Sequence, residues 1–183
     1  MERYMDILFL SKDYKGAVSK AEEFIGKGKT KPRYYGILAF SQYELGDSVN
    51  ALKNADIYFQ KQDPKKIYPN DYRQYGKIQL QNGRVEEADK YFNKAVDMDT
   101  SKNKSEAFRE NAEALRAAKE WMMAYKWYDR LIRQYPDDAK ALDYFYAGVS
   151  AYYGRDYNAA AKAYEAMEAK FPDQPSATYW RGR

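Results

Sequence analysis

Residues 83–92 read GRVEEADKYF, in which a glycine at position 83 precedes an alanine at position 88. The same arrangement, a turn followed by an alanine, recurs along the whole chain. The recurring alanines are Ala17, Ala51, Ala88, Ala124 and Ala160, and successive ones lie 34, 37, 36 and 36 residues apart. A near-constant period of this length indicates a chain that is built from repeated structural units.

The residues around each alanine repeat as well. An aromatic residue and, four positions later, a small residue precede it; the pairs are Tyr35 with Ala39, Tyr72 with Gly76, Phe108 with Ala112, and Tyr144 with Gly148. Apolar residues between the turns recur at intervals of three and four, which is typical of amphipathic helices, and strict alternation is absent. Each unit is therefore predicted to consist of two helices, with large rings packed opposite small residues.

Glycine within the units and proline between them mark the helix ends. Helices are predicted at residues 2–11, 14–27, 32–45, 48–61, 69–82, 85–98, 104–118, 121–134, 138–153 and 157–170, with a last helix from 175. In the unit around Ala124 the turn position holds Lys119 and Glu120 instead of glycine. The two helices of that unit are therefore candidates for partial fusion.

This pattern resembles the tetratricopeptide repeat (TPR), a helix–turn–helix unit of about 34 residues. The resemblance implies an all-α, right-handed superhelical solenoid of antiparallel helix pairs, in a single array of five units plus a terminal helix. The units are expected at about residues 1–31, 32–65, 69–102, 105–138 and 141–174, with a partial helix at 175–183. The last two units are also similar to TPRs of bacterial envelope proteins, which favours a periplasmic or envelope location over a cytoplasmic one.

Composition removes most kinds of catalytic chemistry. The 183 residues include no cysteine and no histidine, so thiolate and imidazole groups are unavailable as nucleophiles, bases or metal ligands. Adjacent carboxylates such as Glu86 and Glu87 do not face each other on a helix. No apolar run approaches the length of a membrane span. We therefore expect a protein that is not an enzyme, with no catalytic, metal or cofactor site and no small-molecule substrate.

The resemblance also implies which residues face a partner, because certain positions of the first helix in each TPR line a concave groove. The groove candidates are Arg33, Phe40, Tyr43, Arg73, Lys77, Arg109, Arg116, Phe145, Val149, Tyr152 and Tyr153. Aromatic rings beside arginine are typical of residues that dominate binding energy at protein interfaces. The resulting hypothesis is a protein–protein interaction scaffold that holds a protein or peptide in its concave groove.

Two other interpretations remain open. The chain could be a structural or docking segment of a larger bacterial envelope protein that self-associates through its terminal helix. Independently of that role, Phe145, Val149 and Tyr152 could bury against the final helix around Tyr179 and Trp180, or against a further repeat, instead of facing a groove. Nucleic-acid binding is less favoured, because the lysines gather in inter-unit turns and 27 acidic residues offset 31 basic ones, for a net charge of +4.

Overall fold

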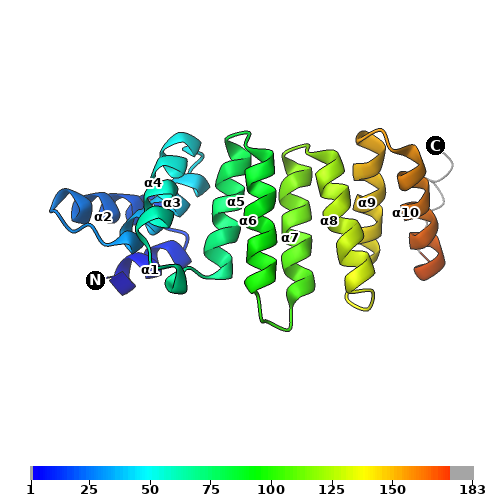
Figure 1. Ribbon diagram of the computed structural model, residues 1–183, viewed down its shortest axis with the longest axis horizontal. Helices are drawn as coiled ribbons and strands as arrows, with labels where there is room; N and C mark the ends of the chain where they lie inside the picture. The colour runs from blue at the N-terminus through cyan, green and yellow to red at the C-terminus, as the bar shows by residue number, and fades with distance from the viewer. Residues whose placement is uncertain (1, 174–183) are drawn as a thin grey trace. The chain divides into compact units, whose positions relative to one another are not determined.

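The computed structural model describes the backbone of residues 2–173 and the side chains of residues 3–173. Within this range the chain forms ten α-helices and one short 3₁₀-helix, without strands (Figure 1). The helices are α1 (Glu2–Leu10), α2 (Tyr14–Gly26), α3 (Pro32–Glu44), α4 (Ser48–Lys61), η1 (Pro64–Lys66), α5 (Pro69–Gln81), α6 (Val85–Met98), α7 (Lys104–Ala117), α8 (Trp121–Gln134), α9 (Ala141–Tyr153) and α10 (Tyr157–Lys170). The predicted helix from 175 lies outside the described residues.

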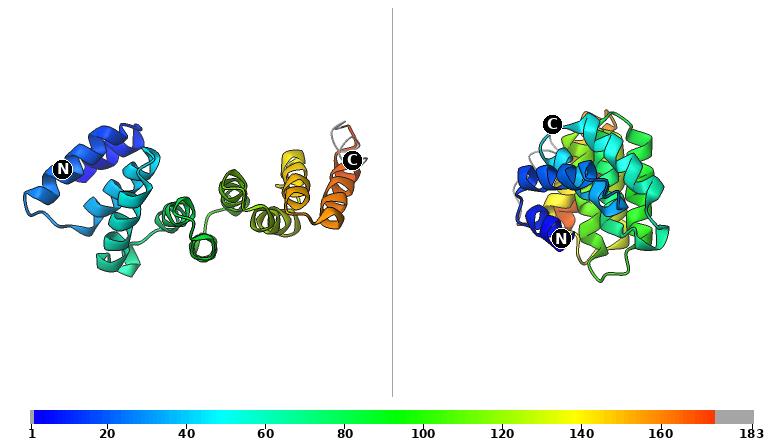
Figure 2. Two further views of the ribbon diagram at one scale, coloured as in Figure 1. Left: turned by 90° about the horizontal axis from the view of Figure 1, so that it is seen from above. Right: turned by 90° about the vertical axis from the view of Figure 1, so that its left-hand side faces the viewer.

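The described chain divides into two compact parts, each made of several repeats, which are called the N-terminal unit and the C-terminal unit from here on. The N-terminal unit runs to Met98 and holds α1 to α6, and the C-terminal unit begins at Asp99 and holds α7 to α10. Within each unit consecutive helices pack side by side, and α8 contacts both α7 and α9 (Figure 2). The predicted fold class, an all-α stack of helix pairs, is confirmed, and most helix ends agree with the prediction to within one residue.

The repeating small residues lie where the helices approach one another. All five recurring alanines are buried, and four of them have no exposed surface. A methyl group added at Gly76 would lie 2.6 Å from the ring of Phe92, and one at Gly148 would overlap the ring of Tyr164. The rings therefore occupy the space that the small residues leave open, as the sequence predicted.

The turn inside each helix pair uses one left-handed residue. Gly46 and Gly83 adopt φ angles of 82° and 74°, and Lys119 adopts the same conformation at 64°. The prediction that the two helices of the repeat around Ala124 partly fuse is wrong, because α7 ends at Ala117 and α8 begins at Trp121. A lysine can supply the left-handed turn that glycine supplies elsewhere, at a conformational cost of about 1 kcal/mol.

Helix α9 shows the largest departure from the predicted bounds. It begins at Ala141 rather than at 138, after a turn in which the N–H groups of Asp138 and Ala139 bond to the carbonyl oxygen of Tyr135. The carboxylate of Asp143 then accepts the N–H of Lys140 at 2.8 Å and caps the helix. A capping carboxylate at the third helical position fixes the start of α9.

Candidate partner-binding surfaces

Two of the groove candidates are buried. Phe40 is only 3% exposed, and its ring centroid lies 5.9 Å from that of Tyr58 and 6.4 Å from that of Phe9 on α1. Arg109 is 7% exposed because it is held by Asp143 on α9. These two side chains face neighbouring helices, where they stabilise the fold, and they do not offer a surface to a partner.

Arg109 forms a bidentate ion pair with the capping carboxylate of Asp143. Its Nε and Nη2 donate to the two carboxylate oxygens at 2.8 and 2.9 Å, and Nη2 also donates to the carbonyl oxygen of Asp138. Glu106 accepts from Nη1. The hydrogen bond with Asp143 raises the pKa of Arg109 and thus favours its charged form. The pair ties the start of α9 to α7.

The N-terminal unit holds a comparable but more open pair at Asp71 on α5. The Asp71 carboxylate accepts the backbone N–H of Tyr68 and the hydroxyl of Tyr58, both at 3.0 Å. Arg33 donates to it at 3.3 Å and to Asp6 at 3.0 Å, with 37% of its side chain exposed. Burial, followed by the charge of Asp71, raises the pKa of Tyr58 to about 12. Arg33 is thus a groove candidate that remains accessible.

The other candidates of the N-terminal unit are half-buried. Tyr43 lies on α3 and packs against the core between α3, α4 and α5, and burial raises the pKa of its hydroxyl. Arg73 and Lys77 lie on α5, four residues apart and hence on the same face of the helix. These three side chains keep part of their surface open to a partner.

Arg116 and Phe145 of the C-terminal unit contact aromatic rings. The guanidinium of Arg116 lies 4.1 Å from the ring centroid of Tyr146, a cation–π contact between α7 and α9. Phe145 is half-buried, with its ring centroid 5.4 Å from that of Tyr146 and 6.4 Å from that of Tyr164 on α10. The predicted alternative contacts with Tyr179 and Trp180 lie outside the described residues.

The last three candidates lie on α9, and two of them join an exposed group of rings. Val149 is half-buried, whereas Tyr152 and Tyr153 are 42% and 58% exposed. Tyr153 stacks on Trp121 with centroids 4.9 Å apart, and Tyr152 meets both Tyr153 and Tyr157 at 5.6 Å. Trp121, Tyr152, Tyr153 and Tyr157, the four-ring cluster, thus form a continuous aromatic surface where α9 ends and α8 and α10 begin.

Sequence reasoning missed Trp121 and Tyr157. Both are the first residue of the second helix in their pair, three positions before the recurring alanines Ala124 and Ala160. Tyr14 occupies the same position before Ala17. An alignment of the repeats at this position is the signal that could have found them.

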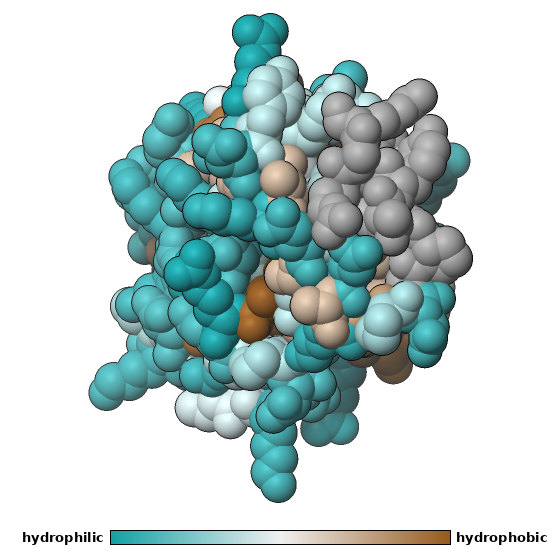
Figure 3. All heavy atoms as spheres, turned by 90° about the vertical axis from the view of Figure 1, so that its right-hand side faces the viewer, coloured by the Kyte–Doolittle hydropathy of each residue, from teal (hydrophilic) through white to brown (hydrophobic). Residues whose placement is uncertain are grey.

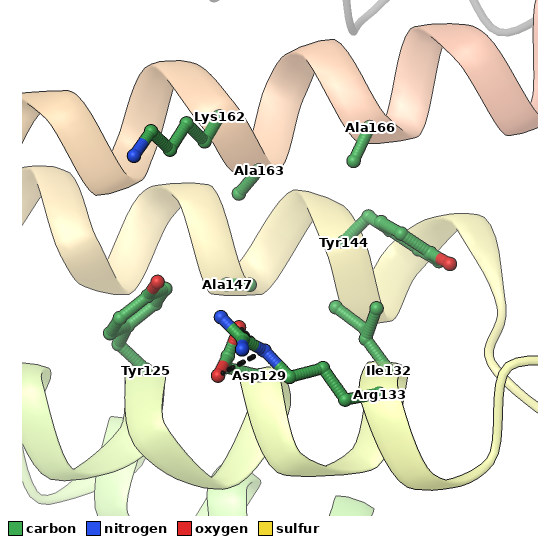
Figure 4. Close-up of a pocket in the computed structure, with 9 residues that line it drawn as sticks. All are labelled: Tyr125, Asp129, Ile132, Arg133, Tyr144, Ala147, Lys162, Ala163 and Ala166. Atoms are coloured by element: carbon green, nitrogen blue, oxygen red, sulfur yellow. Dashed lines mark hydrogen bonds and ion pairs between the residues drawn. The ribbon is translucent and has the colours of Figure 1, made fainter.

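A hollow of about 110 Å³ lies among α8, α9 and α10 (Figure 4). Three alanines from two of these helices, Ala147, Ala163 and Ala166, face it, and Asp129 and Arg133 of α8 form an ion pair at 2.9 Å beside them. The remaining lining residues are Tyr125, Ile132, Tyr144 and Lys162. Seen toward α10, the described surface is mainly hydrophilic, with small apolar areas between the charged side chains (Figure 3).

The described part of the chain holds neither a candidate metal site nor a candidate membrane span. Between residues 2 and 173 there is no group of three or more acidic, histidine or cysteine side chains that could hold a metal ion. In the same range no helix combines the length and the apolar character that crossing a membrane requires.

The helix pairs, their buried alanines and their turn geometry define a helical-repeat protein. The family model of the tetratricopeptide repeat matches residues 75–139 and 146–183, which is more than half of the chain. The chain belongs to the tetratricopeptide repeat family. Proteins with this architecture generally serve as non-catalytic scaffolds for protein–protein interaction. No curated protein matches the sequence.

Solved structures of TPR proteins share this fold. The C-terminal part of a TPR repeat-containing protein from Cytophaga hutchinsonii superposes with a TM-score of 0.75 at 24% identity, over 99% of this chain and 69% of that one. YrrB, reported as a TPR protein with an unusual peptide-binding site, gives 0.68 at 14% identity, over 99% and 90%. MamA gives 0.63 at 14% identity, over 91% of each chain.

Proposed function

We propose that this protein is a non-enzymatic scaffold that binds a protein or peptide partner along the first helices of its repeats. In the C-terminal unit the main contact is the four-ring cluster, in which Tyr152 and Tyr153 of a first helix meet Trp121 and Tyr157 of second helices, together with Val149 and the exposed part of Phe145. In the N-terminal unit Arg33, Tyr43, Arg73 and Lys77 form a separate candidate contact. The binding needs no cofactor, because it depends on shape, apolar area and charge.

The observation that carries this proposal is a group of four touching rings at one place, of which Tyr152, Tyr153 and Tyr157 are exposed and Trp121 is half-buried. Single exposed apolar residues are ordinary, whereas a contiguous group marks an interaction surface. Tyrosine and tryptophan lose little conformational entropy on binding and are enriched among the residues that dominate interface energies. The peptide-binding site reported for YrrB, which shares the fold, supports a peptide as the kind of partner.

Partner capture from the source cell with chemical cross-linking, followed by a binding assay with the captured protein, tests the proposal. The double variant Tyr152→Ala/Tyr153→Ala should weaken binding at least tenfold, since two such contacts are each worth about 1 kcal/mol or more. The triple variant Tyr43→Ala/Arg73→Ala/Lys77→Ala tests the N-terminal unit separately.

Tyr4→Ala is the matched control, because Tyr4 is an exposed tyrosine outside the cluster and apart from the groove candidates. It should bind the partner as the unaltered protein does. Circular dichroism should show that each variant keeps its helices. Unchanged affinity in both the double and the triple variant, with the fold intact, would exclude this surface as the binding site.

A further inference from the structure

The hollow in the C-terminal unit has a filled counterpart in the N-terminal unit. There the ring of Tyr75 on α5 lies between two other rings, with centroids 4.2 Å from Phe59 on α4 and 4.4 Å from Tyr91 on α6. The ring of Tyr75 is stacked on Phe59, and its hydroxyl donates to Asp56. Only 5% of Tyr75 is exposed. A tyrosine side chain thus fills the space between α4, α5 and α6.

The repeat alignment places alanines at the corresponding positions of the C-terminal unit. Tyr75 precedes Gly76 as Ala147 precedes Gly148, and Tyr91 follows Ala88 by three residues as Ala163 follows Ala160. Each replacement removes an entire phenol ring from the same place between three helices. The hollow of about 110 Å³ lies beside Ala147 and Ala163, at the positions where the N-terminal unit carries these rings.

Two other residues around the ring of Tyr75 have counterparts of similar character beside the hollow. The positions of Phe59 and Asp56, eight and five residues after Ala51, correspond to Ile132 and Asp129, eight and five residues after Ala124. Both Ile132 and Asp129 line the hollow. An apolar wall and a carboxylate acceptor therefore remain, while the ring that uses them in the N-terminal unit is missing.

We propose that this hollow binds a tyrosine side chain presented by a partner peptide. The incoming ring lies against Ala147 between Ile132 and Ala163, as the ring of Tyr75 lies between Phe59 and Tyr91. Its hydroxyl donates to Asp129, whose carboxylate has acceptor positions beyond the one used by Arg133. At about 110 Å³ the hollow is smaller than the about 150 Å³ apolar cavity that accommodates benzene, so the bound ring keeps one edge open to solvent.

Charge around the hollow suits an aromatic ring. Arg133 and Lys162 stand beside it, and the guanidinium of Arg133 reaches across toward Ala147 in Figure 4. A cation over a ring face adds an attraction that an aliphatic side chain lacks. The site is separate from the four-ring cluster and uses none of its residues. A test of the hollow therefore does not decide whether the proposed groove binds a partner.

The experiment uses the full chain with methyl-labelled alanine and isoleucine, and three capped tripeptides as probes: Gly-Tyr-Gly, Gly-Phe-Gly and Gly-Ala-Gly. Titration with the tyrosine peptide should shift the methyl signals of Ile132, Ala147 and Ala163 along a saturable curve. The phenylalanine peptide should bind about tenfold more weakly, because it cannot bond to Asp129. The alanine peptide should not shift these signals.

Ala147→Tyr is the decisive variant, since it would fill the hollow as Tyr75 fills its counterpart. It should keep the helical fold and lose the binding of the tyrosine peptide. Asp129→Asn, which keeps the shape of the side chain, should reduce the preference for tyrosine over phenylalanine to about twofold or less, and it serves as the readout if Ala147→Tyr does not fold.

Three results would overturn the proposal. One is the absence of saturable shifts at the three methyl groups. Another is equal binding of the tyrosine and phenylalanine peptides to the unaltered protein. The third is binding that appears only after Tyr179→Ala/Trp180→Ala, because the chain's own C-terminal residues would then be the occupant in place of a partner.

Discussion

Each of the two units buries an aspartate at the start of a helix, but the groups that pair with its carboxylate differ. In each, a buried aspartate at the start of a helix accepts a backbone N–H, as Asp71 does on α5 and Asp143 on α9. Asp143 is matched by a buried bidentate Arg109, whereas Asp71 is served by the Tyr58 hydroxyl and a half-exposed Arg33. The carboxylate is the fixed requirement because it caps the helix. The group that pairs with it differs between the units, so the two pairs are expected to contribute unequally to stability.

Removal of Arg109 is expected to have the largest effect. Arg109→Ala leaves the Asp143 carboxylate buried without its cation, and losses of this kind are about 3–5 kcal/mol in the free energy of unfolding. Arg33→Ala, at a pair open to solvent, should cost about 1 kcal/mol or less. Urea unfolding combined with hydrogen exchange of α9 and α5 measures both. Equal losses in the two variants would show that the difference in burial does not matter.

Alkaline pH should destabilise both units, because each holds buried tyrosines whose pKa is raised. Burial and Asp71 raise the pKa of Tyr58 from 10.0 to about 12. The folded chain therefore holds the neutral phenol more strongly than the unfolded chain does, so this stabilisation is complete below pH 10 and is lost as the pH rises from 10 to 12. A rise of about 2 in the pKa of Tyr58 corresponds to at most about 2.7 kcal/mol in the free energy of unfolding.

Leu131 of the C-terminal unit occupies the position equivalent to Tyr58, seven residues after its recurring alanine, and cannot ionise, but burial raises the pKa values of Tyr128 and Tyr164 in that unit to about 12 as well. Tyr58→Phe should therefore remove only the share of the stability loss above pH 10 that Tyr58 contributes, measured by denaturant unfolding at several pH values. Absorbance at 295 nm should show one fewer late-titrating tyrosine. A variant whose stability still falls as steeply as that of the unaltered protein would assign the alkaline loss to other tyrosines.

The close contacts between glycines and aromatic rings should make an added methyl group destabilising in both units. Gly148→Ala forces a methyl group into the ring of Tyr164, and Gly76→Ala places one 2.6 Å from Phe92. Overpacking of this kind costs about 1–3 kcal/mol. Gly26→Ala is the control, because nothing lies within 4 Å of the added methyl group and the change should be neutral or slightly stabilising. Thermal unfolding of the three variants tests this order.

The repeat pattern predicted most of the fold because it depends on positions that recur. The five alanines and the glycines opposite rings carry the helix packing, and their period was visible without structure. The start of α9 was misplaced, since it depends on the carboxylate of Asp143 accepting the N–H of Lys140, a contact that the spacing of the alanines and rings does not report. Fusion of α7 and α8 was wrongly expected because a lysine takes a conformation that sequence reasoning reserves for glycine.

The candidate surface was less predictable than the fold. Phe40 and Arg109 occupy groove positions by repeat alignment, yet their side chains are used by neighbouring helices, and only the three-dimensional contacts reveal this. The role of the remaining candidates in partner binding stays a prediction. The hollow beside Ala147 has no motif of its own. It becomes visible only when that alanine is compared with Tyr75, whose ring fills the same place.

The smallest expected effect concerns the turns. The N-terminal unit places Lys12, Gly46 and Gly83 at left-handed turn positions, whereas the C-terminal unit uses Lys119 and Arg155, with φ angles of 64° and 66°, and no glycine in the turns that the structure describes. Lys119→Gly should therefore stabilise the C-terminal unit by about 0.5–1 kcal/mol, because it relieves the strain of a side chain in this conformation. Gly83→Ala should destabilise the N-terminal unit by a similar amount, because it places a side chain in the strained left-handed conformation. Thermal unfolding of both variants measures the pair, and a loss of stability in Lys119→Gly would mean that the lysine side chain contributes contacts that outweigh the strain of its backbone.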